Sequence, residues 1–491
     1  MNNDGMLLAM LAVGIGGMAL SNFYLSLNRF EAVLFIVASI VVSVLGAIFA
    51  WDRFSKVGRE NRKRIERIRE IPPSLLNPGN DGVKMGVDQD LKIPIYLPDS
   101  LRSRHIHILG ATGSGKTESV VLNFLRQDVE RGMGSIVLDA KGDASFLWSL
   151  KKWVPKGRLK VFDLSSEDSL SYNPLEAGTP LEAAQRLFSS LVWSEEYYKS
   201  KAFSALQRLF QKYFEDKKRN PRLSVLADYL DDPETFSSFA ASESYPKKLA
   251  EKNFSELSGL RDQIKTLSIG HLAKILSPEG DSQMKLEDAY DGTVLYFRLQ
   301  SLLSPQLVST LGKLLINHLN FLAGTAHRVE GAAIRSKLIP TYLDEFASFA
   351  CPEFADLISK ARSAGLALHF SHQSVGDLAE VSKGFINRIT DNSATKIILR
   401  ISDPDSADYF ARSFGTKLYQ KITHRITNVK ETDPGELVGE GSQREAHQFR
   451  SPPDLFKTLP TGVGSVLVAH GYETPHGAST VFRIRFPRLS D

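Results

Sequence analysis

The sequence predicts an α/β fold built around a parallel sheet, with an all-helical insertion and two apolar segments ahead of it. The first observation is an apolar run at 106–109, a glycine-rich turn, a helical stretch at 118–131 and a second apolar run at 135–139. This pattern requires parallel strands, because the helix must cross back over the sheet. The second is the absence of strand-like runs at about 179–285, where leucine and phenylalanine recur at helical spacing. The third is the uncharged stretch from Ala32 to Trp51.

Length and composition narrow the class of protein. A chain of 491 residues has room for roughly three domains of about 150 residues each. Its 42% hydrophobic and 24% charged residues are ordinary for globular proteins and exclude collagen-like, coiled-coil and wholly disordered chains. A single cysteine, Cys351, excludes a disulfide scaffold and a Cys-rich zinc site. The net charge of +4 arises entirely between Asp52 and Glu70, so the bulk charge does not predict a chain coated with nucleic acid.

The front of the chain is predicted to form a membrane hairpin of two helices. Gly5 to Leu27 and Ala32 to Trp51 carry no charge, and each is long enough to cross a hydrocarbon core of about 30 Å. The alternatives are a cleaved signal peptide for the first segment, although residues 1–4 have no basic character, and a buried core helix for the second. Eight lysines and arginines follow the second segment, so we expect both termini in the cytoplasm. The basic run is either only a topology signal or also a site for anionic lipid.

A phosphate-binding loop follows the run at 106–109. The pattern G-x-x-x-x-G-K-[ST] lies between a predicted strand and a predicted helix, which is the context that this motif requires. Its glycines let successive backbone N–H groups surround phosphate oxygens, and the start of the helix adds a favourable dipole. We expect Lys116 to reach the β- and γ-phosphates of ATP and Thr117 to hold Mg²⁺. The loop consists of Gly110, Ala111, Thr112, Gly113, Ser114, Gly115, Lys116 and Thr117.

Further candidate site residues follow two later apolar runs. Asp344 and Glu345 end the run at 338–343, where Asp344 is expected to orient Mg²⁺ and Glu345 to polarise the attacking water. Gln373 follows the run at 366–370 and is either a sensor of the γ-phosphate or an ordinary polar loop residue. Arg362 precedes that run and is either an arginine finger acting across a subunit boundary or a solvated charge. The adjacent glutamate favours hydrolysis over passive binding.

These patterns divide the chain into five segments. Further strands are predicted at 160–163, 293–297, 338–343, 366–370, 396–401, 465–468 and 480–484, and a polar loop at 423–445. The segments are the transmembrane hairpin at 1–52, a juxtamembrane linker and approach to the core at 53–100, the first part of the nucleotide-binding domain at 101–178, the all-α insertion at 179–285 and the second part of the nucleotide-binding domain at 286–491.

Taken together, the motifs resemble those of the type IV coupling proteins of conjugation and type IV secretion (TraG/TraD-like), within the FtsK/HerA-like P-loop superfamily. The resemblance covers nearly the whole chain, and its specificity comes from the order of the motifs rather than from any one besides the P-loop. In chain order they are the two-span anchor, Arg104-His105, the P-loop, Asp139-Ala140-Lys141-Gly142-Asp143, Tyr172-Asn173-Pro174-Leu175, Leu343-Asp344-Glu345, Ala361-Arg362-Ser363-Ala364-Gly365-Leu366, His372-Gln373-Ser374, Asn392 with Thr395-Lys396-Ile397, Asp403-Pro404-Asp405 and Leu459-Pro460-Thr461-Gly462-Val463-Gly464.

The resemblance implies a RecA-like nucleotide-binding domain and a homohexameric ring on the cytoplasmic face of a bacterial inner membrane. It implies that Arg362 is the finger inserted into the neighbour's ATP site, with Arg104 as a lesser candidate. It also implies the partners: type IV secretion channel components, and relaxosome-bound single-stranded DNA, protein effectors, or both. Two features depart from some relatives, because the chain ends at Asp491 without a long acidic tail and only about four residues separate the two spans.

Three functions remain open from the sequence. The preferred one is a membrane-anchored ring ATPase that recruits and pumps substrate into a type IV secretion or conjugation channel. The alternative from a different class is a nucleotide-gated receptor or scaffold that recruits substrate without powering transport, against which Glu345 argues. A DNA motor for chromosome handling is the third, weakened because no separate DNA-reading tail is visible. The sequence leaves open whether the cargo is DNA or protein.

Overall fold

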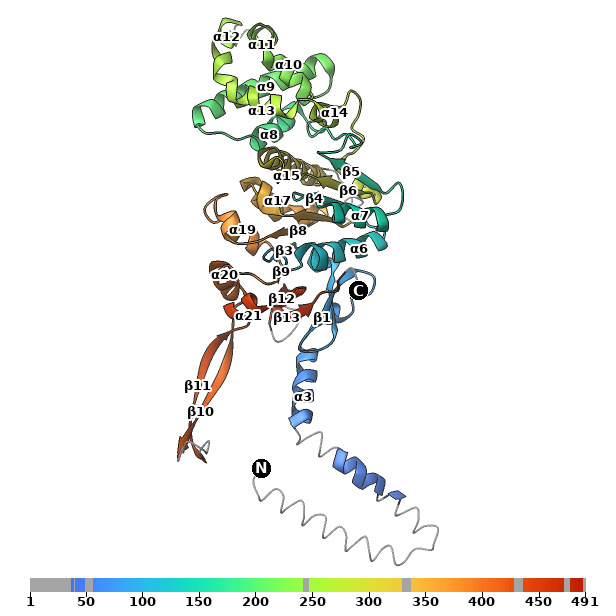
Figure 1. Cartoon of the computed structure of the whole chain (residues 1–491), viewed down its shortest axis with the longest axis vertical. Coiled ribbons are helices and arrows are strands. Elements are labelled where there is room, and N and C mark those ends of the chain that lie inside the picture. Colours follow the sequence, from blue (N-terminus) through green and yellow to red (C-terminus); the bar gives the residue numbers. More distant parts are fainter. Residues whose placement is uncertain are drawn as a thin grey trace, which may run out of the picture. The chain divides into compact units, whose positions relative to one another are not determined.

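The computed structural model describes residues 37–38, 40–48, 56–241, 247–328, 337–427, 436–471 and 477–488. The chain divides into two compact units, Met1–Ile71 and Pro72–Asp491. In the first unit, residues 40–48 are helical, and a second helix, α3, runs over Lys56–Arg69 (Figure 1). The first predicted span lies outside the described residues, and the second lies partly outside them. No helix in the described ranges is long and apolar enough to cross a membrane.

An eleven-stranded sheet forms the centre of the second unit, in the order β2-β1-β13-β12-β9-β3-β8-β7-β4-β6-β5. The seven strands from β9 to β5 are parallel, and the other four extend the sheet in antiparallel fashion. Their bounds are β1 Gly82–Asp88, β2 Pro94–Pro98, β3 Ile106–Leu109, β4 Ser135–Asp139, β5 Leu159–Asp163, β6 Val294–Arg298, β7 Ile339–Asp344, β8 Leu366–His372, β9 Thr395–Ile398, β12 Val463–Ala469 and β13 Ser479–Arg485.

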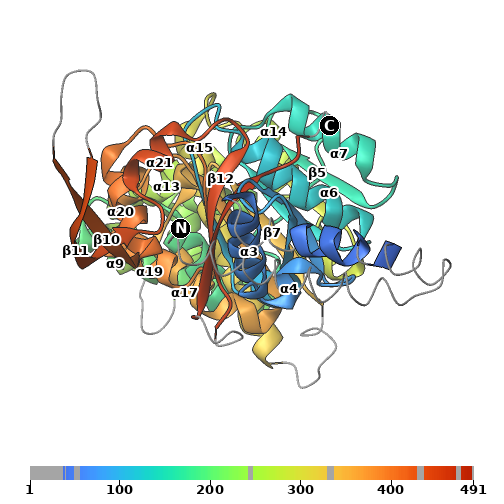
Figure 2. The same ribbon diagram turned by 90° about the horizontal axis from the view of Figure 1, so that it is seen from below.

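The parallel strands have short, continuously apolar sequences because helices cover both faces of the sheet that they form. All residues of β3, β4, β7, β8 and β9 are buried, and such strands read as continuous apolar runs rather than as alternating ones. Figure 2 shows two of the covering helices on one side of the strands and two on the other. The helices are α6 Leu122–Glu130 and α7 Ala144–Trp153, then α17 Pro352–Lys360 and α19 Phe385–Asp391. The predicted mixed α/β fold with a parallel sheet is therefore confirmed.

Between Thr179 and Lys285 the described residues form helices and no strand, as the leucine spacing predicts. The first of these helices starts with Thr179 and Glu182 in a capping box and with Pro180 in its first turn. Figure 1 shows these helices grouped beyond α15 Pro305–Arg328, at the β5 side of the sheet. They are α8 Pro180–Ser190, α9 Glu196–Lys217, α10 Leu223–Asp231, α11 Pro233–Ala240, α12 Lys247–Phe254, α13 Ser258–Leu267 and α14 His271–Leu276.

Short helices complete the second unit. Three of them start at a proline, which is suited to the first turn of a helix because its missing N–H has no intrahelical partner there. In the second of these, α20, the side chain of Asp403 also caps the first turn by accepting from two backbone N–H groups. The short helices are α4 Pro73–Leu76, α5 Asp99–Arg102, α18 Gly376–Ala379, α20 Pro404–Phe414 and α21 Pro453–Thr458.

One prediction about this unit is wrong, and two strands were not predicted. The segment 423–445 was expected to be a loop, but much of it belongs to a two-stranded hairpin of β10 Thr416–Thr427 and β11 Glu436–Phe449. The polar sequence gave no strand signal, and among the described side chains near the start of β10, Leu418 and Tyr419 are about half exposed rather than packed in a core. Residues 82–98 lie in the segment predicted as the linker and entry to the core, and they form β1 and β2. The prolines that indicated a linker, Pro72, Pro73 and Pro78, precede both strands. Those within β2 suit its place in the sheet, since an edge strand tolerates proline.

Candidate nucleotide site at the carboxyl edge of the sheet

The P-loop begins at the carboxyl end of β3 and leads into a π-helical turn, Lys116–Val121, which continues as α6. Gly113 and Gly115 have φ angles of 73° and 96°, in the left-handed region that other residues rarely adopt. Ala111 N donates to Arg400 O, and Ser114 N donates to Ala111 O. The glycines that the motif requires therefore stand where the backbone turns most sharply.

Lys116 is the buried cation of this loop, with 5% of its surface exposed. Its ammonium donates a hydrogen bond to the carbonyl oxygen of Gly110. Burial lowers the pKa of Lys116, and the negative charges of Glu345 and Asp344 oppose that shift. A buried ammonium is suited to receive a phosphate group, because the negative charge of the phosphate favours the charged form of the lysine, which burial disfavours.

Asp344 ends β7 and meets the P-loop directly. Thr117 Oγ1 donates to Asp344 Oδ2 over 2.8 Å, and the hydroxyl of Ser371 donates to Asp344 Oδ1. A hydroxyl beside a carboxylate suits Mg²⁺, which is commonly bound through one or two protein oxygens together with phosphates and water. The described residues contain no cluster of three or more His, Cys, Asp or Glu side chains arranged as a metal cage. The predicted pair Thr117 and Asp344 therefore fits a shared magnesium site.

Glu345 and Gln373 form a second polar chain at the same edge. Gln373 Nε2 lies 3.2 Å from each carboxylate oxygen of Glu345 and donates to them. Thr112 Oγ1 donates to Gln373 Oε1 over 3.0 Å, so the amide connects the P-loop to the glutamate. Glu345 has a φ of 50°, a left-handed conformation that is uncommon for residues other than glycine and is often found at functional sites.

Arg362 does not join this group. It lies in a turn, Ala361–Ala364, that precedes β8, and its side chain is exposed. Gln373 follows the other end of the same strand, so the seven residues of β8 separate the two by roughly 20 Å. Arg104 precedes β3 and also lies at the amino edge of the parallel strands. Within one chain, the structure thus brings together Lys116, Thr117, Asp344, Glu345 and Gln373, but places both arginines at the opposite edge.

Sequence reasoning missed several residues that support the site. Ser371 fixes Asp344, although only its place near the end of a predicted strand marks it in the sequence. Gly462 N donates to Ser114 O and Thr461 Oγ1 to Gly113 O, so a segment about 350 residues away holds the P-loop backbone. That segment was noted as part of the resemblance, without a role. Its contact partner is not visible from a single sequence.

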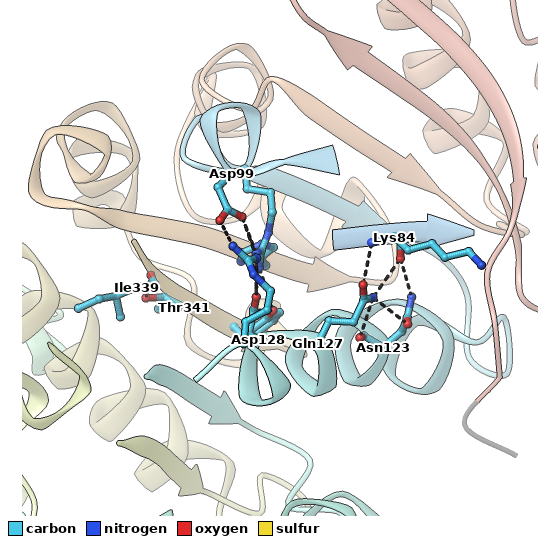
Figure 3. A network of polar contacts seen from close by, with 11 residues as sticks. Lys84, Asp99, Asn123, Gln127, Asp128, Ile339 and Thr341 are labelled. Carbon is cyan, nitrogen blue, oxygen red and sulfur yellow. Dashed lines mark hydrogen bonds and ion pairs between the residues drawn. The ribbon is translucent and has the colours of Figure 1, made fainter. Parts of the chain in front are cut away.

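A buried ion pair anchors the helix that follows the P-loop. Asp128 of α6 receives two hydrogen bonds from Arg102 of α5, at 2.8 and 2.7 Å, and both side chains are fully buried. The hydroxyl of Tyr342 on β7 also donates to Asp128. Figure 3 shows this cluster beside a second one, in which Gln127 donates to Lys84 O and accepts from Lys84 N as a strand would. Both clusters fix α6, and hence the P-loop, to the sheet.

Two family models match the chain. Residues 83–281 match the model described as Helicase HerA, central domain, and residues 339–457 match the TraM recognition site of TraD and TraG. The type 4 coupling protein DotL of Legionella pneumophila is 25% identical over 408 residues, which cover 67% of this chain and 51% of DotL. These matches support a type IV coupling protein of the P-loop superfamily. The chain spans about half the length of the curated relative.

Solved structures of the coupling protein TrwB and of VirB4 share the fold. The bacterial conjugative coupling protein TrwBdeltaN70 has a TM-score of 0.62 at 14% identity, covering 84% of this chain and 90% of that one. TrwB with a non-hydrolysable ATP analogue scores 0.61 at 15% identity, covering 85% and 92%. VirB4 of Thermoanaerobacter pseudethanolicus scores 0.52 at 16% identity, covering 84% and 97%. At these identities the likeness concerns the fold, and it matches the mixed sheet and P-loop described above.

Proposed function

We propose that this coupling protein is an ATPase that recruits substrate and pumps it into a type IV secretion or conjugation channel. The observation that carries the proposal is the hydrogen bond between Thr117 and Asp344, which assembles both predicted magnesium ligands beside Lys116. ATP and Mg²⁺ are the proposed cofactors, and TrwB has been solved with ADP and Mg²⁺ and with a non-hydrolysable ATP analogue.

The residues divide the work of phosphoryl transfer among them. The backbone of the P-loop and the ammonium of Lys116 bind the β- and γ-phosphates, and Thr117 and Asp344 hold the metal. Mg²⁺, when bound, neutralises the charge that develops on the phosphates. Glu345 accepts a hydrogen bond from the attacking water and orients it, and Gln373 joins Glu345 to the loop that binds the γ-phosphate. The site is therefore equipped for hydrolysis as well as binding.

A homohexameric ring completes the site in this proposal. Arg362 is exposed at the amino edge, where its own P-loop is out of reach but a neighbouring subunit's carboxyl edge can meet it. A guanidinium from a neighbour stabilises charge on the transferred phosphoryl group and couples hydrolysis to assembly. Arg104, half-buried and bound to Ala469 O at 3.2 Å, is the second candidate.

The proposed location is the bacterial inner membrane, with two spans and both termini in the cytoplasm. The described residues of the second predicted span support it. Helical residues at 40–48 are apolar apart from Ser43, and their large side chains, such as Val42 at 68% and Leu45 at 59%, are exposed. A helix that is apolar all round requires an apolar environment. The basic helix α3, which has Arg67 and Arg69 in its last turn, fits the cytoplasmic side.

Substrate class and partners are proposed from the family. The match to a TraM recognition region supports relaxosome proteins with single-stranded DNA as cargo, and protein effectors are the second candidate. Channel components of a type IV secretion system are the expected partners on the membrane side. The alternative function is a nucleotide-gated receptor or scaffold, in which ATP binding recruits substrate and hydrolysis is unnecessary.

Substrate transfer between cells tests the proposal. Lys116→Ala is expected to abolish transfer while the protein remains in the membrane, and transfer at the normal level would contradict a nucleotide-driven role. Glu345→Gln separates the two candidate functions, because it retains binding and removes the carboxylate that orients water. Loss of turnover together with transfer supports the pump, whereas loss of turnover with transfer intact supports the scaffold.

A further inference from the structure

The loop after β4 is clamped by a single buried carboxylate. Asp139 is 1% exposed and accepts hydrogen bonds from the backbone N–H groups of Gly142 and Asp143 at 2.9 and 3.0 Å. The hydroxyl of Tyr296 donates a third bond to it over 2.6 Å. These bonds leave the loop at residues 139–143 little freedom to move, although it lies at the rim of the nucleotide site.

Close packing from a neighbouring loop further restricts this segment. Gly142 has a φ of 69°, and a Cβ added there would lie 2.3 Å from Cγ and 3.1 Å from Cα of Gln300. Gln300 itself has a φ of 57°, a strained conformation for a residue other than glycine. Arg298 Nε and Ser301 N donate to carbonyl oxygens of the loop at 2.9 and 2.7 Å. A strained backbone that packs this closely against the loop indicates that the conformation of residues 139–143 is functionally important.

Lys141 is the long cationic side chain that this rigid loop presents to solvent. Its side chain is 59% exposed, and Nζ lies 3.0 Å from Oδ2 of Asp143. The register of β4 against β7 pairs Asp139 with Asp344, the predicted magnesium ligand. Lys141 lies two residues after Asp139 in the chain. Neighbouring strands lie about 4.8 Å apart, which is within the reach of a lysine side chain.

The electrostatics agree with this placement. The positive charge of Lys141 contributes to lowering the pKa of Lys116, after the larger effect of burial. The pKa of Lys141 is raised, first by its hydrogen bond to Asp143 and further by the charges of Asp139 and Asp344. These charge interactions agree with a Lys141 ammonium at the edge of the sheet that carries Lys116 and Asp344.

We propose that Lys141 is a second phosphate-binding cation of the nucleotide site, which exchanges Asp143 for an oxygen of the γ-phosphate when a nucleoside triphosphate binds. The proposal rests on the proposed function of the site. An exposed ion pair contributes little stability, so Asp143 releases the lysine at small cost. The γ-phosphate is the group that we expect Lys141 to bind. Glu345 and Gln373, which act on that phosphate in the proposed function, lie at the same edge of the sheet as Lys141. In this role, Lys141 makes the site bind ATP more tightly than ADP, in addition to the phosphate binding by Lys116.

A purely structural role is the competing explanation. Asp143 caps α7 by accepting from Ser145 N over 2.9 Å, and Lys141 then only steadies that cap. The two explanations differ in what they predict for nucleotides. A phosphate ligand changes the affinity for triphosphate and leaves that for diphosphate unchanged, whereas a structural lysine changes both equally or neither.

The test is equilibrium binding of a non-hydrolysable ATP analogue and of ADP, each with Mg²⁺, to the full chain in detergent. Lys141→Gln is expected to weaken the analogue about tenfold, the usual value for a lost charge-assisted hydrogen bond, and to leave ADP unchanged. Lys141→Arg is expected to restore most of the affinity. Lys152→Gln, at the far end of α7, is the matched control and is expected to change neither nucleotide.

Equal affinity of the wild type and Lys141→Gln for the analogue would overturn the proposal, and so would an equal loss for both nucleotides. Should Lys141→Gln lower the melting temperature, Lys141→Met keeps the stem of the side chain without its charge and is judged by the same criterion. A wild-type chain that binds neither nucleotide would instead refute the proposed function itself, so the two failures are distinguishable.

Discussion

Thr117 and Asp344, 227 residues apart in the chain, are joined by a hydrogen bond of 2.8 Å from the threonine hydroxyl to the carboxylate. The P-loop and the end of β7 are thereby held together before any ligand is considered. Because Ser371 holds the other carboxylate oxygen, Asp344 has little freedom to rotate away. The site is therefore arranged in advance for a metal ion bridging protein and phosphate, and its residues differ in what they are expected to contribute.

Asp344→Asn is expected to remove magnesium-dependent binding. The amide retains hydrogen bonding to Thr117 and Ser371 but loses the charge that attracts the cation. We expect the Mg²⁺ concentration for half-maximal binding of an ATP analogue to rise at least about tenfold, which titration at fixed nucleotide measures. Asp356→Asn, an exposed carboxylate paired with Arg388, is the control. An unchanged magnesium requirement would remove Asp344 from the metal site.

Glu345→Gln is expected to separate hydrolysis from binding. The amide keeps the size of the side chain but no longer accepts a proton from the attacking water. Removing a general base lowers the rate by about 10²- to 10⁴-fold. We therefore expect steady-state ATP turnover of the full chain to fall by at least a hundredfold while the affinity for the ATP analogue is preserved. Retained turnover would assign water activation to another residue.

The sequence predicted the site well where chemistry is carried by local patterns. The P-loop, Asp344, Glu345 and Gln373 each follow a buried strand, and parallel strands bring their carboxyl ends to one edge, so their convergence follows from the topology. Arg362 was predicted without a place relative to the P-loop. Its position at the opposite edge depends on which end of β8 it precedes, and this strengthens the expectation of a role between subunits.

The sequence predicted the fold less completely where packing is long-range. No strand was predicted for β1 and β2, which follow a segment rich in proline and glycine that indicated a linker. They are strands of the sheet because β1 pairs with β2 and with β13 near the end of the chain. The described side chains of the β10–β11 hairpin, such as Leu418 and Tyr419, are not buried, so its sequence gives little of the apolar alternation that marks a half-buried strand. The buried pair of Arg102 and Asp128 is equally invisible, because two charged residues in a sequence predict surface positions until the structure shows them in contact.

Asp128→Ala is expected to destabilise the second unit strongly. The substitution leaves the guanidinium of Arg102 fully buried without its main partner, and breaking such a pair typically costs about 3–5 kcal/mol. Thermal or denaturant unfolding of the full chain measures the loss. Arg126→Ala, on the same helix, removes an ion pair with Glu130 whose side chains are 47% and 59% exposed, and we expect less than about 1 kcal/mol. Equal effects of the two variants would show that burial does not govern these pairs.

Stability is expected to fall on acidification below about pH 6.5. Burial lowers the pKa of both His105 and His372 to about 4 from an ordinary 6.5. The unfolded chain then binds more protons than the folded one, so the stability present above pH 6.5 is lost as the pH falls towards 4, by roughly 2 kcal/mol for each histidine at pH 5. Asp139, whose pKa burial raises to about 6, opposes this in part, because its protonation favours the folded state.

Melting temperatures between pH 7.5 and 5 measure this dependence. His105→Asn is the informative variant. Asparagine tolerates the φ of 69°, and its side-chain oxygen can accept the hydrogen bond that Leu368 N donates to Nδ1 of His105. It is expected to make the decline shallower, and His447→Asn, at an exposed position of β11, to leave it unchanged. A decline of the same slope in all three proteins would assign the acid sensitivity to other groups.

Mixing of subunits decides whether Arg362 acts between copies of the chain. Arg362→Ala and Lys116→Ala are each expected to lose ATP turnover, the first because its neighbour's site lacks a guanidinium and the second because its own site cannot bind phosphate. In a mixed ring, some sites combine an intact P-loop from one subunit with an intact Arg362 from the next, so co-assembled variants are expected to recover turnover.

ATP turnover that rises and then falls as the ratio of the two chains is varied would show that the site is shared between subunits. If every mixture stays inactive while both variants still assemble, Arg362 contributes no finger, and Arg104 becomes the residue to substitute in the same design.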